Sequence, residues 1–247
     1  MKIVFLGTNG WYDTKVGDTV CTLIETKDFS VIFDAGNGIW KLDKYCDFKK
    51  PAFLFLSHFH LDHIFGLHIL AKFKFKNGLT IFGQKGTKEM LKKIINSPFA
   101  VPISKLSFKV KIKDLKEGVH KVPFFVKCKF LLHADPVFGY QIELEGKKIA
   151  YCTDTGDCLS LRELAKNVDL LIAGTALPAG VKISKWPHLN PIEAAKIAKE
   201  SKAKKLVLTH FSARLFPTKK ERKLAERMAK KIFKNTIAAF DEMRLLL

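Results

Sequence analysis

The chain has 247 residues, 47% of them hydrophobic, and no linker, repeat or low-complexity tract, so we expect one domain over residues 1–247 with a sizeable core. Its net charge of +19 favours an anionic partner, although 38 of the 43 basic residues are lysines spread along the chain, as on solvated faces and in heat-adapted proteins. The five cysteines are scattered, which argues against a disulfide framework, and no apolar run is long enough to span a membrane. The N-terminal residues show no signal-peptide pattern, so a soluble, cytoplasmic protein is expected.

The first half of the chain reads mainly as strands. Buried strands are predicted at residues 2–8, 19–26, 29–36 and 52–57, the second and third forming a hairpin. Apolar residues at helical spacing follow at 63–73. A strand at 79–83 then precedes a helix at 87–95, for which Thr87 is the expected N-cap.

The second half alternates strands and helices. Strands are predicted within 103–132, 140–154, 168–174, 205–211 and 243–247, with a hairpin turn at Glu145 and Gly146. Helices that begin with capping boxes are predicted at 192–201 (Asn190 and Glu193) and 222–233 (Thr218 and Glu221). Two β-rich halves, each followed by helices, predict two sheets packed face to face with helices on both outer faces.

One short stretch, SHFHLDH at residues 57–63, holds three of the eight histidines and directly follows the apolar run AFLFL. Side chains alternate along an extended chain, so His58 and His60 point the same way, while Asp62 and His63 follow where the chain turns into a helix. Neutral imidazole and carboxylate are ligands of zinc and similar metals. The cluster therefore predicts a metal site rather than a group of buried structural histidines.

Further ligand-type residues stand at the ends of apolar strands. His133 follows FLL, Asp154 follows IAYCT, and His210 follows KLVLT. A site built on strand ends would gather them beside the histidine cluster. Two metals sharing Asp154 as a bridge would use all seven side chains, namely His58, His60, Asp62, His63, His133, Asp154 and His210.

The motif SHFHLDH, with Asp34 in FDAG and the three later residues, resembles the metallo-β-lactamase superfamily, whose HxHxDH motif and later His, Asp and His form a binuclear site. The order and spacing match along nearly the whole chain. The resemblance implies an αββα sandwich and two divalent metal ions, with zinc expected and manganese or iron as alternatives. It assigns His58, His60 and His133 to the first metal, Asp62, His63 and His210 to the second, Asp154 to the bridge, and Asp34 to orienting the loop.

Two segments favour the phosphodiesterase branch of this superfamily. LTHFSAR at 208–214 and FGYQI at 138–142 resemble ribonuclease Z, and the TPGHT run of thioesterases and lactonases is missing after His133. Two features depart from ribonuclease Z. Gly174 in AGTA stands where that family has the glutamate of HEAT, and the 20 residues between His133 and Asp154 leave no room for a tRNA-gripping arm.

His188, in PHLNPIEAAKIA, aligns with a histidine that this branch places beside the metals. The resemblance implies that it contacts the phosphoryl group and protonates the leaving oxygen. A metal-bridging hydroxide oriented by Asp62 is the implied nucleophile. Asp62 and His188 are thus the expected catalytic residues, whereas His120 is expected in a surface loop.

Four functions remain open at this point. The first is a metal-dependent phosphodiesterase acting on an anionic phosphodiester, and the second is a ribonuclease Z-like endonuclease acting on precursor tRNA, whose binding would weaken steeply with salt. A thioesterase or lactonase is the remaining enzyme class. A nucleic-acid-binding module with a degenerate metal site is the alternative outside enzymes. A homodimer is compatible with each of these functions, and no membrane partner is expected.

Overall fold

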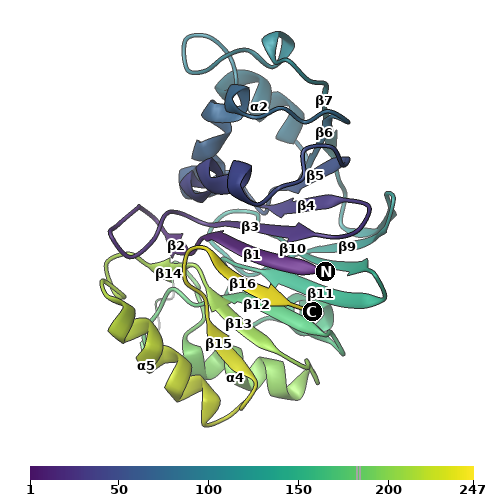
Figure 1. The fold of residues 1–247 in the computed structure, drawn as a ribbon. Coiled ribbons are helices and arrows are strands. Elements are labelled where there is room, and N and C mark those ends of the chain that lie inside the picture. Colours follow the sequence, from purple (N-terminus) through teal and green to yellow (C-terminus); the bar gives the residue numbers. More distant parts are fainter. Residues whose placement is uncertain (182, 184) are drawn as a thin grey trace.

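The computed structural model describes residues 1–181, 183 and 185–247, which form two seven-stranded sheets packed face to face (Figure 1). In the first sheet, β4 to β7 are parallel, and β16, β1 and β3 complete it in antiparallel order. Its strands are β16 (Met243–Leu246), β1 (Lys2–Gly7), β3 (Cys21–Glu25), β4 (Ser30–Phe33), β5 (Ala52–Phe55), β6 (Leu79–Gly83) and β7 (Val110–Asp114).

The second sheet is also mixed. Its strands, in spatial order, are β15 (Thr236–Ala238), β13 (Leu206–Thr209), β12 (Leu170–Gly174), β11 (Lys147–Cys152), β10 (Phe138–Leu144), β9 (Phe125–Phe130) and β8 (Gly118–Lys121). Two short strands, β2 (Asn9–Gly10) and β14 (Phe211–Ser212), pair in parallel beside the sandwich. This pairing joins the N-terminal half of the chain to the segment that follows β13.

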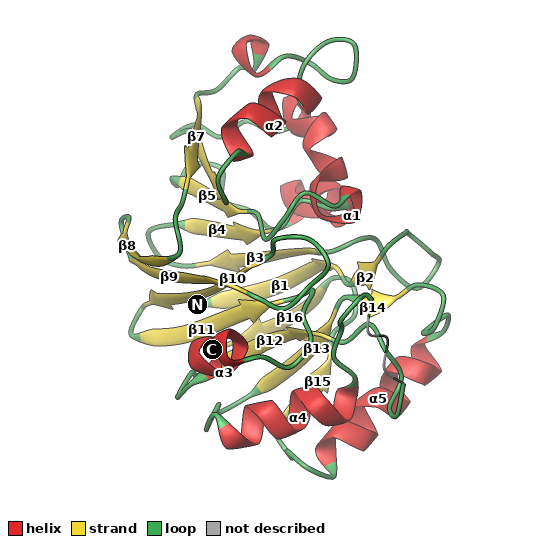
Figure 2. Ribbon diagram, turned by 180° about the vertical axis from the view of Figure 1, so that it is seen from behind, coloured by secondary structure: helices red, strands yellow, loops and turns green. Residues whose placement is uncertain are grey.

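Helices cover both outer faces, with α2 on one side and α4 and α5 on the opposite side (Figure 2). Those packed on the first sheet are η1 (Asn37–Lys44), α1 (Leu61–Ile64), η2 (Phe65–Lys72) and α2 (Thr87–Ile94), with η3 (Ile103–Lys105) beyond them. Those packed on the second sheet are α3 (Leu159–Ala165), α4 (Pro191–Glu200) and α5 (Lys219–Lys230). The predicted αββα sandwich is therefore confirmed. In the described part of the chain, no helix is both long and apolar enough to cross a bilayer.

The core between the sheets is rich in aromatic rings. Phe33 stacks on Tyr151 from the opposite sheet with ring centroids 4.5 Å apart, and Phe55 meets Tyr140 edge to face at 5.3 Å. All four side chains are fully buried. Aromatic pairs of this kind add about 0.5–1.5 kcal/mol beyond the area that they bury. They fix the two sheets relative to one another directly beneath the strand ends that carry the histidines.

The local predictions are mostly confirmed, with informative exceptions. Both capping boxes are present, and Glu145 and Gly146 form the β10–β11 turn with φ values of 49° and 70°. Thr87 is not an N-cap: Gly86 occupies that position, and the Thr87 hydroxyl donates to the Gln84 carbonyl instead.

Three other segments differ from their predicted form. The helix expected at 63–73 is one α-turn followed by the 3-10 helix η2, and the stretch 103–132 contains η3 besides its strands. His120 lies on the edge strand β8 rather than in a loop. The strand expected at 205–211 is broken at His210, whose φ of 53° separates β13 from β14.

The edge of the first sheet is lined with lysines. Lys109, Lys111 and Lys113 alternate with partly buried residues along and just before β7, and all three are exposed. Such alternation is typical of an edge strand that has one face in contact with solvent. Part of the positive charge therefore belongs to the solvated edge of a sheet.

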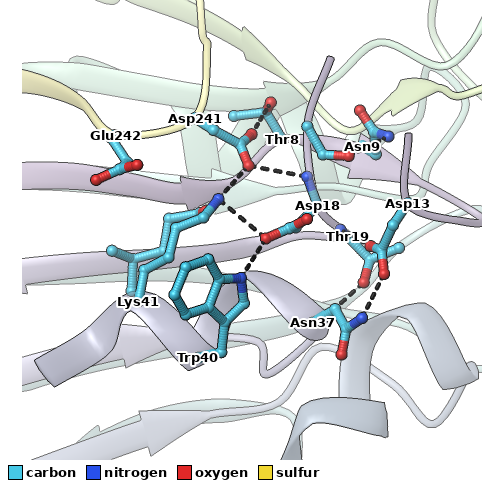
Figure 3. Close-up of polar contacts among 12 residues, drawn as sticks. Thr8, Asn9, Asp13, Asp18, Thr19, Asn37, Trp40, Lys41, Asp241 and Glu242 are labelled. Atoms are coloured by element: carbon cyan, nitrogen blue, oxygen red, sulfur yellow. Dashed lines mark hydrogen bonds and ion pairs between the residues drawn. The ribbon is translucent and has the colours of Figure 1, made fainter. Parts of the chain in front are cut away.

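A network of charged and polar residues joins segments near the two ends of the chain, next to the loop that follows β2 (Figure 3). The buried Lys41 amine donates to the Leu6 carbonyl and pairs with Asp18 and Asp241. Asp241 also accepts a hydrogen bond of 2.6 Å from the Thr8 hydroxyl, to which the fully buried Arg222 donates at 2.8 Å.

Asn9 extends this network into the loop that follows β2. Its side-chain carbonyl accepts from Arg222, and its amide donates to the backbone carbonyls of Tyr12 and Gly17. Because these groups are buried and hydrogen-bonded, they fix the conformation of the loop. Residues 10–12 are thereby placed against the strand ends that carry the histidines.

Candidate metal centre

The histidine and carboxylate side chains predicted from the sequence converge on one edge of the sandwich. They follow the C-terminal ends of β4, β5, β9, β11 and β13, which all open toward this edge. Asp34 follows β4, the residues of SHFHLDH follow β5 and enter α1, and His133, Asp154 and His210 follow the other three strands. The structure brings all of them together, with His188 from the segment before α4.

One group of donors consists of Asp62, His63 and His210, whose ligand atoms lie within 4.8 Å of one another. His63 Nε2 and His210 Nε2 are 3.0 Å apart, and Asp154 Oδ1 lies 3.3 Å and 3.2 Å from them. Asp62 Oδ2 is 3.3 Å from His210 Nε2. Two imidazole nitrogens and two carboxylate oxygens thus face a common point.

A second group consists of His58, His60, His133 and Asp154, whose ligand atoms also lie within 4.8 Å. The rings of His58 and His60 are 4.4 Å apart between centroids, and that of His133 lies 5.4 Å from His60. Asp154 is 3% exposed and belongs to this group, and its Oδ1 also lies 3.3 Å from His63 Nε2 and 3.2 Å from His210 Nε2 of the other group. Its carboxylate therefore stands between the two groups.

Charge and hydrogen bonding in the cluster fit a cation. His58 Nε2, His133 Nε2 and Asp154 Oδ1 are buried and have no hydrogen-bond partner among the described residues. An unpaired buried polar atom is costly, and a metal ion would satisfy all three atoms at once. Imidazole nitrogens with carboxylate oxygens suit zinc, manganese or iron alike.

The pKa shifts point the same way. Burial alone would raise the pKa of Asp154, but His210 and His63 hold it well below its ordinary value. Burial lowers the pKa of His58, and the neighbouring His63 lowers it further. Burial also lowers the pKa of His133. His63 differs: burial would lower its pKa, but Asp154, Asp34 and Asp62 raise it well above its ordinary value. An ionised Asp154 beside neutral His58 and His133 is the protonation state that metal ligands need.

Asp34 supports the cluster from beneath. Its carboxylate accepts hydrogen bonds from the Ser57 backbone and hydroxyl at 2.7 and 2.9 Å and from the Tyr151 hydroxyl at 2.8 Å. It also lies 2.8 Å from His63 Nδ1, which leaves His63 Nε2 to face His210. The structure thus places Asp34 in direct contact with His63, Ser57 and Tyr151.

We expect Asp34→Ala to destabilise the metal-free protein by about 3–5 kcal/mol, because it leaves buried donors on both sheets unpaired. Urea unfolding of the metal-free protein measures this loss. The control is Asp28→Ala in the exposed turn between β3 and β4, which should stay within about 0.5 kcal/mol of the parent. A loss at Asp34 no larger than that of the control would contradict the supporting role.

The loop after β2 forms a wall of the site that the sequence did not reveal. The Trp11 backbone N–H donates to Asp62 Oδ2 at 2.7 Å, and Trp11 holds a φ of 81°. At Gly10, a side chain would meet the His210 ring at 2.3 Å. Glycine is therefore required where the loop backs this imidazole. The only signal in the sequence is a glycine three residues after the first strand.

Asp135 is a second residue missed by the sequence analysis. Its carboxylate lies 2.8 Å from His60 Nε2, which leaves His60 Nδ1 for the cluster. Such carboxylate contacts commonly orient metal-binding histidines. Asp135 follows His133 by two residues, but only the fold shows that it reaches back to His60.

His188 lies beside the cluster, with its ring centroid 5.0 Å from that of His133 and 6.0 Å from that of His210. Burial lowers the pKa of His188 to about 4. No described residue forms a hydrogen bond with its imidazole. Gly174, which replaces the HEAT glutamate, packs so closely that an added Cβ would lie 2.6 Å from the Thr153 carbonyl. A residue with a side chain at position 174 would therefore displace the backbone at Thr153.

Comparisons with known proteins agree with this geometry. The model of the beta-lactamase superfamily domain matches residues 30–211. Ribonuclease Z of Bacillus licheniformis is 25% identical over 304 aligned positions, which cover 98% of this chain and 97% of the relative.

Two solved structures share the fold. The metallo-beta-lactamase fold protein YhfI from Bacillus subtilis superposes with a TM-score of 0.83 at 24% identity, over 99% of this chain and 98% of that one. The short form of human tRNase Z superposes with a TM-score of 0.77 at 23% identity, over 100% and 99% of the two chains. The likeness extends along the whole sandwich rather than over the histidine motif alone.

Proposed function

Since the chain belongs to the beta-lactamase superfamily and is a metal-dependent hydrolase of its ribonuclease Z-like branch, we propose that it hydrolyses phosphodiester bonds at a binuclear metal centre. The observation that carries the proposal is the position of Asp154, which belongs to the group of His58, His60 and His133 and also lies 3.3 Å from His63 Nε2 and 3.2 Å from His210 Nε2. His58, His60 and His133 would hold one ion, and Asp62, His63 and His210 the other. Asp154 would bridge the two ions.

The side chains around the metals have separate tasks in this proposal. Bound divalent ions lower the pKa of water and neutralise charge on phosphoryl oxygens. Asp62, held by the Trp11 backbone, orients the attacking water. His188 contacts the phosphoryl group, whose negative charge raises the lowered pKa of this imidazole, so that His188 takes up a proton and passes it to the leaving oxygen. Asp34 and Asp135 keep His63 and His60 in their orientations.

A ribonuclease Z-like action on precursor tRNA is the second candidate. It is favoured by curated relatives named ribonuclease Z that align along 98% of this chain, and by the net charge of +19. Against it stands the segment between His133 and Asp154, which the β10–β11 hairpin nearly fills. A phosphodiesterase with a less specialised substrate therefore remains the first choice.

Paired assays test the proposal. Protein loaded with Zn²⁺, Mn²⁺ or Fe²⁺ is given bis(p-nitrophenyl) phosphate and, separately, a 3′-extended tRNA, over a range of salt concentrations. We expect hydrolysis of the small diester that stops on chelation and returns when metal is restored. Cleavage of the tRNA that weakens steeply with salt would favour the second candidate. If metal-loaded protein hydrolyses a thioester or lactone and neither diester, the proposal is wrong.

Asp135→Asn is expected to lower metal affinity by about 10- to 100-fold, because the amide holds His60 less firmly and makes it a weaker base. Competition with a fluorescent zinc chelator measures this affinity. Asp157→Asn is the matched control, since this exposed aspartate pairs with Arg162 away from the histidines. Equal affinities of the two variants would show that the contact between Asp135 and His60 is incidental.

A further inference from the structure

Two of the three tryptophans lie beside the candidate metal centre and are exposed. Trp186 has its ring centroid 5.8 Å from those of both His60 and His133, and it is 49% exposed. Trp11 adjoins the other group of donors through its contact with Asp62, and it is 64% exposed. Each group of metal-binding candidates therefore has an exposed indole next to it.

These indoles differ from the third tryptophan. Trp40 donates its indole N–H to Asp18 at 2.6 Å and lies against lysine amines. In the described chain, neither Trp11 nor Trp186 has a hydrogen-bond partner for its indole N–H. Large exposed aromatic groups gathered at one place usually mark a binding surface. Packing within the fold does not account for these two.

The position of Trp11 is enforced by the fold. Its φ of 81° is unfavourable for a residue with a side chain, and it is maintained by the backbone contact with Asp62 and by the loop contacts of Asn9. The Arg214 guanidinium lies 5.9 Å from the centre of the indole. A cation and an aromatic face are thus presented together beside the centre.

We propose that Trp11 and Trp186 are base-stacking residues that hold a single-stranded nucleic acid across the metal centre, with one base against each indole. This inference rests on the proposed phosphodiesterase function and specifies its substrate. Base–aromatic stacking accepts any base and contributes about 1–3 kcal/mol per base. The cation at Arg214 and the net charge of +19 suit the phosphate backbone on either side.

The test compares substrates with and without bases. Short single-stranded oligouridylate is compared with a ribose-phosphate chain of the same length without bases, and deoxy forms of both distinguish RNA from DNA. For Trp11→Leu and Trp186→Leu, we expect KM for the base-bearing chain to rise by about 5- to 150-fold each. KM for the abasic chain should change much less. Trp11→Phe and Trp186→Phe should restore most of the preference because they keep an aromatic face.

Phe99→Leu is the control, since Phe99 is 73% exposed in the segment after α2 and forms no ring contact with a site residue in the described part of the chain. A second readout is independent of activity: base-bearing chains should quench the tryptophan fluorescence of the metal-free protein, and abasic chains should not. Equal KM changes for both kinds of chain, or phenylalanine variants as weak as the leucine ones, would overturn the stacking role. Absence of hydrolysis of every diester by the parent would instead refute the proposed function, while the fluorescence measurement would still judge the stacking.

Discussion

Asp154→Ala is expected to abolish metal binding and hydrolysis together. The carboxylate lies 3.3 Å from His63 Nε2 and 3.2 Å from His210 Nε2, and it also belongs to the group of His58, His60 and His133. Removing it leaves five imidazoles and one carboxylate to hold two dications, without the negative charge that both would share. Replacing residues outside the ligand shell typically costs 10- to 100-fold, so we expect a loss of activity of more than about 100-fold here.

Elemental analysis of the purified variant measures bound metal, and hydrolysis of bis(p-nitrophenyl) phosphate measures activity. Asp157→Ala is the matched control, because it removes an exposed aspartate three residues away that pairs with the half-exposed Arg162. Circular dichroism and thermal unfolding of the metal-free proteins establish that both variants fold. An Asp154→Ala protein that keeps two ions and normal turnover would remove the basis of the proposed function.

His188→Ala should behave differently, with metal content preserved and kcat lowered by about 10²- to 10⁴-fold. His188 lies next to His133 and His210 but contributes to neither of the two groups that contain the other predicted ligands. Its ligand atom is nevertheless within 4.8 Å of those of Asp154 and His210, so metal binding is the competing role. Metal analysis separates the two roles, because removing a metal ligand would lower the metal content of the variant, whereas removing a proton donor would leave it unchanged.

The control for this variant is His120→Ala on the exposed edge strand β8. A leaving group whose conjugate acid has a lower pKa needs less protonation. The loss of kcat in His188→Ala should therefore be smaller for p-nitrophenyl diesters than for alkyl diesters. An equal loss for both kinds of leaving group would argue against proton donation. Unchanged kcat with both would show that His188 only packs against its neighbours.

The predictions from sequence succeeded where a feature is local. The motif at 57–63 places its donors within seven residues, and His133, Asp154 and His210 each follow an apolar strand, so a strand-end site could be inferred before the fold was seen. The capping boxes and the turn at residues 145–146 are local in the same sense. Side-chain chemistry and element order were enough for these features.

The sequence analysis missed features that depend on contacts between distant segments. Trp11 meets Asp62 across 51 positions, and Asp135 meets His60 across 75. The sequence predicts a strand through His210 because strand-forming residues flank it on both sides, whereas in the structure the chain turns at His210 before β14 pairs with β2. Thr87 is a residue type favoured at the N-cap, but its hydroxyl donates a hydrogen bond to the Gln84 carbonyl instead. In each case a tertiary contact prevailed over the local preference.

The lysine row on β7 bears on how copies of this protein behave at high concentration. The unpaired backbone N–H and C=O groups of an edge strand can pair with the edge strand of a second molecule. The three lysine ammonium groups at and just before β7 repel the same groups of a second copy and so oppose this pairing. Acetylating these amines removes the repulsion while leaving the strand's hydrogen-bonding groups in place. The acetylated protein is therefore expected to associate edge to edge more readily than the unmodified protein.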